Sequence, residues 1–109
     1  MKKHPDRLRK AGISPARYAE LKAVCRQYQE YRRRVRSPGA LRRLRIIEAC
    51  AEAVAVPAVA RAIIRCATEG TCYEHIRPPI GRNQFYALVL RFYIELDRVL
   101  WEEIGRAHV

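Results

Sequence analysis

The sequence predicts an all-α domain of four to five helices, built from an N-terminal basic helical hairpin and a C-terminal helix-turn-helix. Apolar residues recur at spacings of three, four and seven, no strand-like alternation occurs, and proline and glycine separate the periodic stretches. The length of 109 residues suits one domain, and 50% hydrophobic residues suffice for one core. Residues 1–13 carry charges without periodicity, so we expect a flexible basic tail before a single helical domain over 14–109.

The hairpin is expected over residues 14–55. Ser14 and Pro15 form a helix start, because a serine hydroxyl accepts a bond from a free amide and proline tolerates the first helical position. Ser37-Pro38-Gly39 then ends the first helix, and the second begins near Ala40. The expected apolar stripes are Tyr18, Leu21, Cys25, Tyr28 and Val35 in the first helix and Leu41, Leu44, Ile47, Ala51 and Val54 in the second.

The helix-turn-helix is expected over residues 57–104. Pro57 starts a buried helix that extends from Ala58 to about Thr68, and Gly70 ends it. A short piece follows over 71–76, and the last and longest helix is expected over about 82–104. Its apolar positions are Phe85, Leu88, Val89, Phe92, Leu96, Val99 and Leu100.

The charge is strongly asymmetric. The net charge is +11, and residues 1–45 hold 15 basic and 3 acidic side chains, whereas residues 46–109 hold 7 and 8. Such a field attracts phosphate backbones, with anionic lipid as the competing polyanion. Seven arginines around Ser37-Pro38-Gly39 exceed what solubility needs, so we predict that they contact phosphates: Arg32, Arg33, Arg34, Arg36, Arg42, Arg43 and Arg45.

The segment over 62–86 has the order of a helix-turn-helix. Glu69-Gly70, Tyr73-Glu74-His75-Ile76 and the stretch from Gly81 to Tyr86 resemble the helix-turn-helix of sigma-factor region four, as in small phage or mobile-element transcription regulators of Gram-positive bacteria. The resemblance covers about residues 62–97. Pro78-Pro79 stand where that family has a longer second helix, which predicts a truncated second helix here.

The resemblance implies that the start of the last helix contacts bases. Arg82 then pairs with guanine or phosphate, and the side-chain amides of Asn83 and Gln84 match adenine or bridge to phosphate. The implied DNA-contacting set is Arg77, Arg82, Asn83, Gln84, Ala87 and Arg91. We expect this set and the arginine-rich turn to lie on one solvent-facing side, where the arginines hold phosphates beside the bases.

Enzymatic chemistry is not expected. The sequence has no Gly-rich phosphate loop, no His-Glu-x-x-His and no acidic cluster for magnesium. Glu69 and Glu74 are interpreted as solvated residues rather than a catalytic pair, and His75 as an exposed residue with no nucleophile beside it. No catalytic residue, cofactor or metal is predicted, since the four cysteines and three histidines lack zinc-finger spacing.

The sequence therefore predicts a sequence-specific DNA-binding protein, a transcription regulator of a phage or mobile element. The partners that fit are double-stranded DNA, RNA polymerase and a second copy, since the stripe of the first helix suits a dimer interface as well as a monomer core. No membrane segment is expected, and the unpaired cysteines favour a cytoplasmic location.

Two other classes of function also fit the sequence. The first is a protein-interaction or assembly factor, such as a packaging or polymerase adaptor, with an exposed patch of Tyr18, Tyr28, Tyr31, Tyr93 and Trp101. The second is RNA binding through the arginine cluster, because arginine-rich helices also bind RNA.

Overall fold

The computed structural model describes residues 4–107, and the side chains of residues 4–103. Within this range the chain is all-α, as predicted, with four longer helices and three short ones. The longer helices are α2 (Pro15–Arg26), α4 (Pro38–Val54), α5 (Pro57–Glu69) and α7 (Arg82–Ala107). The short helices are α1 (Asp6–Lys10), α3 (Tyr28–Arg33) and α6 (Tyr73–Ile76).

The predicted helix boundaries at Ser14, Pro57 and Gly70 are confirmed, and the second helix begins two residues earlier than expected. The Arg17 backbone N–H donates to Ser14 Oγ at 3.1 Å, so Ser14 caps α2 as expected. Pro57 occupies the first turn of α5, as expected. Helix α4 begins at Pro38, so Pro38 and Gly39 lie inside the helix that was expected to start near Ala40, because proline suits a first turn that needs no N–H donor. Gly70 ends α5 in the left-handed conformation at φ 73°, which glycine adopts without steric cost.

The single long helix expected before Ser37 is wrong, because the chain breaks at Gln27 into α2 and α3. Leu21 and Cys25 are fully buried in the monomer, whereas Val35, the last residue of the expected stripe, is 44% exposed. The break turns α3 against α4, so that Tyr28 and Tyr31 pack on the core, while α2 crosses to α5 and α7. The buried stripe of α2 is therefore part of the monomer core and is not available as a dimer surface.

The flexible tail predicted over 1–13 is wrong for the residues from 4 onward, while residues 1–3 lie outside the described part. Residues 6–10 form α1, which contacts α7, and Leu8 and Ile13 are 0% and 1% exposed. His4 Nε2 donates to the carbonyl oxygen of Ile13 at 2.6 Å. Two apolar residues five apart show no periodicity in the sequence, yet both are covered by the domain.

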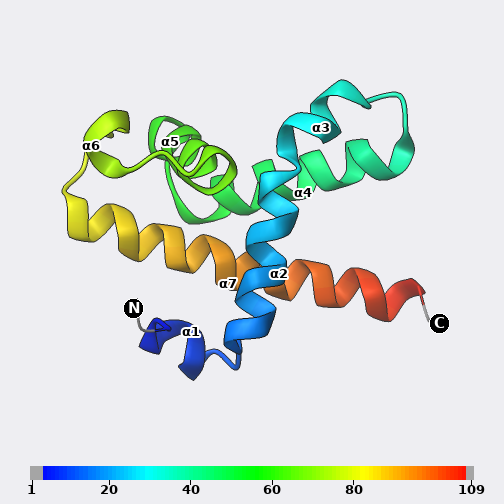
Figure 1. Ribbon diagram of the computed structural model, residues 1–109, viewed down its shortest axis with the longest axis horizontal. Helices are drawn as coiled ribbons and strands as arrows, with labels where there is room; N and C mark the ends of the chain where they lie inside the picture. Colours follow the sequence, from blue (N-terminus) through cyan, green and yellow to red (C-terminus); the bar gives the residue numbers. More distant parts are fainter. Residues whose placement is uncertain (1–3, 108–109) are drawn as a thin grey trace.

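Helix α7 packs against α1, α2, α4 and α5. Phe85, Val89, Phe92, Leu96 and Leu100 are buried along it, which confirms the predicted stripe. Figure 1 shows α7 running along the longest axis, with α6 above its first turn and α3 with the turn into α4 above its far end. The position of each surface group along this axis decides which groups share a site.

Candidate nucleic-acid interface

The first turn of α7 presents three polar side chains to solvent. Arg82, Asn83 and Gln84 are exposed, whereas the next residue, Phe85, is fully buried. The Phe85 N–H donates to the carbonyl oxygen of Gly81 at 2.9 Å, which closes the first helical turn. The two amide side chains are therefore accessible to a partner.

Arg82 already has partners within the protein. Its Nη1 lies 3.2 Å from Glu74 Oε1, and its guanidinium lies 5.9 Å from the centre of the Tyr86 ring. The pKa of Glu74 is lowered, first by a hydrogen bond from its own backbone and also by Arg82, so the carboxylate is charged at neutral pH. The negative charge of Glu74 repels phosphate groups at the start of α7.

The second helix of the expected helix-turn-helix is reduced to the single turn α6, in agreement with the truncation predicted from Pro78-Pro79. Two tyrosines hold this segment on α7: Tyr73 Oη donates to the Ile80 carbonyl oxygen at 2.7 Å, and Tyr86 Oη accepts from the Tyr73 N–H at 3.1 Å. No local pattern in the sequence indicates this pair, because its members are thirteen residues apart. Tyr73 and Tyr86 fix the position of the first turn of α7.

The remaining predicted base-contacting residues are distributed on both sides of that turn. Arg77 is exposed, adopts a left-handed conformation at φ 50°, and its Nε lies 3.4 Å from the Glu74 carbonyl oxygen. Ala87 is half-buried and Arg91 is exposed. Since Asn83, Ala87 and Arg91 are four residues apart, they form one row along α7.

The arginine end, which we define as residues 32–45, is a separate cationic region. Six of its seven arginines are exposed, and Arg43 is half-buried. Arg33 and Arg34 pair with Glu30 at 3.7 and 2.9 Å, and Arg42 pairs with Glu103 at 3.3 Å. Among the described residues, no ion pair engages the other four: Arg32, Arg36, Arg43 and Arg45.

The structure separates the arginine end from the start of α7. Arg42 contacts Glu103, which is 21 residues beyond Arg82 on the same helix, and a rise of 1.5 Å per residue makes this about 30 Å. Figure 1 shows the two regions at opposite ends of the long axis. The expectation that the arginines hold phosphates directly beside the base-contacting turn is therefore wrong, because α4 packs on the C-terminal half of α7.

The aromatic patch expected for a protein-interaction role is not formed. Tyr93 is 4% exposed and lies edge-on to Tyr18 at 5.1 Å between ring centres, within the core. Tyr28 and Tyr31 are half-buried. Trp101 alone of this set is largely exposed, at 56%, with the Arg17 guanidinium 5.0 Å from its ring centre.

His75 does have a potential nucleophile beside it, contrary to the expectation from the sequence. Cys72 Sγ lies 2.9 Å from His75 Nδ1 across the turn of α6. His75 is exposed and Cys72 is half-buried. Among the described residues, no group of three His, Cys, Asp or Glu side chains could hold a metal ion.

The four thiols are expected to differ in reactivity. Burial raises the pKa of Cys25 and of Cys50 to about 12, so neither forms the reactive thiolate at neutral pH. Cys72 is only partly covered. In a native titration with a disulfide reagent at pH 8, Cys72 should react first, and Cys25 and Cys50 only after denaturation. Mass spectrometry of the labelled peptides measures the order, and early labelling of Cys25 would contradict the packing of α2.

Comparison with known proteins adds no family to these observations. No protein-family model, curated protein or solved structure matches the chain. In residues 4–107, none of the helices combines the length and the apolar character of a bilayer-spanning segment. The class of protein is thus defined by the fold and the surface alone: a strongly cationic all-α domain.

Proposed function

We propose that the protein binds double-stranded DNA through its arginine end and, separately, through the first turn of α7. The observation that carries the proposal is the collection of seven arginines at one end of the molecule. Among the described residues, only two carboxylates, Glu30 and Glu103, form ion pairs with these arginines. Guanidinium groups bind phosphate with two parallel hydrogen bonds and release counterions from the duplex. This surface supplies affinity without regard to base sequence.

The distance between the two regions suits a duplex. They are about 30 Å apart along α7, and one turn of B-DNA is about 34 Å. A duplex along the long axis of the protein would therefore present the same groove to both regions. In this arrangement the arginines contact phosphates one turn away from the bases that meet Asn83 and Gln84. A role as a transcription regulator is supported by the resemblance of the α6–α7 segment to sigma-factor region four.

The binding test uses a fluorescent duplex of about three helical turns in an anisotropy titration at several salt concentrations. We expect the logarithm of the affinity to fall by about 0.9 for each phosphate contact per tenfold rise in salt. An RNA duplex and a DNA single strand of the same sequence are the comparison probes. Absence of binding at low salt, or binding that salt does not weaken, contradicts the proposal. Tighter binding of the RNA duplex than of the DNA duplex also contradicts it, because the partner would then be RNA.

Base recognition has its own prediction. Bound sequences selected from a random duplex pool should share a motif, and the double variant Asn83→Ala, Gln84→Ala should lose that motif while keeping the salt dependence. Each bidentate amide contact is worth about 1–3 kcal/mol of discrimination.

The matched control for this prediction is Gln29→Ala, which removes an exposed amide from α3. The control should select the same motif as the unaltered protein. If the double variant also selects that motif, the first turn of α7 does not contact bases, and phosphate binding by the arginine end stands alone.

A further inference from the structure

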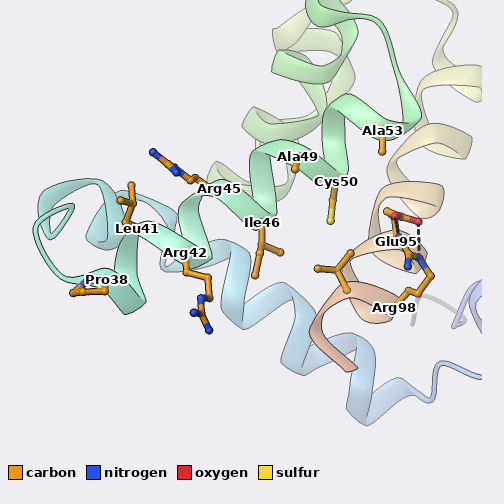
Figure 2. A pocket seen from close by; sticks show the side chains of 11 residues that line it. Pro38, Leu41, Arg42, Arg45, Ile46, Ala49, Cys50, Ala53, Glu95 and Arg98 are labelled. Carbon is orange, nitrogen blue, oxygen red and sulfur yellow. Dashed lines mark hydrogen bonds and ion pairs between the residues drawn. The ribbon is translucent and has the colours of Figure 1, made fainter. Parts of the chain in front are cut away.

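An open apolar hollow lies between α4 and α7. Its volume is about 690 Å³, and its lining is mainly apolar. Figure 2 shows that Ile46 and Cys50 extend from α4 toward the helix that carries Glu95 and Arg98. The hollow is lined by α4, the second helix of the hairpin, and by the C-terminal half of α7, and it does not include the first turn of α7.

The residues that line the hollow suit a packed helix. Ala49 and Ala53 are exposed, four residues apart on one face of α4, and their small side chains leave space above the floor. Ile46 and Cys50 supply apolar surface at that floor, and Val99 supplies it from α7. A third helix placed between two packed helices buries such a surface through residues at positions i, i+3, i+4 and i+7.

The charges around the groove select the occupant. Arg42 and Arg45 stand at the end near Pro38, and no described residue forms an ion pair with Arg45. Glu95 and Arg98 pair with each other at the α7 side of the groove. A second copy carries the same net charge of +11, so two copies repel each other, which is unfavourable. An acidic partner is favoured.

We propose that this groove receives an amphipathic helix of a partner protein, with its apolar face on α4 and α7 and its acidic residues beside Arg42 and Arg45. The apolar contact supplies the affinity, and the arginines set the direction of the bound helix. Arg42 and Arg45 belong to the arginine end and are shared with the proposed phosphate contacts. The apolar part of the groove around Ile46, Ala49 and Val99 lies outside both DNA-contacting regions, so the apolar contact does not require DNA binding.

The probe is a phage-displayed library of helical peptides of about five turns, selected on the intact protein. We expect enriched peptides with apolar residues at i, i+3 or i+4 and i+7, and with aspartate or glutamate clustered toward one end. Failure to enrich such peptides, or enrichment of basic ones, overturns the proposal.

The groove variant is Ala49→Gln, Ala53→Gln, and the matched control is Ala23→Gln, at an exposed position of α2. Both place a good helix former on the surface, so both should keep their helical circular dichroism. The groove variant should raise the Kd of an enriched peptide at least about tenfold, because it buries an unpaired amide, while the control leaves the Kd unchanged. Equal peptide affinity in all three proteins overturns the proposal.

Two further measurements separate this proposal from its alternatives. Sedimentation of the unaltered protein should show a monomer, and a dimer that the groove variant dissociates would make a second copy the occupant and overturn the proposal. The groove variant should keep the duplex DNA affinity of the unaltered protein, since it removes no cation. Absence of duplex binding by the unaltered protein counts against the proposed function only. Loss of peptide affinity with unchanged duplex affinity in the groove variant assigns the peptide to the groove, and loss of both affinities in that variant makes nucleic acid the occupant and overturns the proposal.

Discussion

Substitution of three arginines of the arginine end by glutamine is expected to weaken duplex DNA binding roughly 500-fold at about 0.1 M salt. The reason is that each phosphate contact raises the affinity about eightfold at that salt concentration. The positions are Arg32, Arg36 and Arg45, which are exposed and form no ion pair with any described residue. The fold should not change, since exposed substitutions of this kind alter stability by about 0.5 kcal/mol or less. The slope of log affinity against log salt should fall by about 2.7.

The matched control removes the same charge elsewhere. Arg7, Lys10 and Arg61 are also exposed and without an ion pair among the described residues, and glutamine at all three leaves the arginine end intact. This control should weaken binding only through the long-range field, which salt screens beyond about 10 Å. Equal weakening by both triple variants would show that total charge, and not the arginine end, binds the duplex.

The variant Leu8→Ala is expected to destabilise the domain by about 3 kcal/mol, because Leu8 is 0% exposed and its truncation leaves a cavity. That is a large share of the 5–15 kcal/mol by which a domain of this size is stable. Chemical denaturation followed by circular dichroism measures the free energy of unfolding. Arg7→Ala, one residue away on the exposed face of α1, should change it by less than about 0.5 kcal/mol.

An unchanged free energy of unfolding in Leu8→Ala would mean that α1 does not pack on α7, and the flexible tail expected from the sequence would then be correct. The two outcomes differ by several times the uncertainty of such measurements. The experiment therefore tests directly the burial of the N-terminal segment.

The candidate site was predictable in part. The exposure of Arg82, Asn83 and Gln84 follows from the position of Phe85 on the apolar stripe of the last helix, which is a local periodicity. The partners of Arg82 were not predictable, because Glu74 belongs to another helix and reaches Arg82 only through the turn between them. Charged residues also carry no periodic signal that would place the arginine end relative to α7.

The sequence by itself determined the all-α class, the helix starts at Pro15 and Pro57, and the end of α5 at Gly70. These features depend on proline, glycine and hydroxyl groups that act on the backbone beside them. Only the tertiary structure decided the break at Gln27, the burial of Leu8, the separation of about 30 Å between the two cationic regions and the groove between α4 and α7. The break at Gln27 follows from the packing of α3 on α4. The other three follow from the direction in which helices distant in sequence cross α7, and that direction is set by side-chain packing across the core.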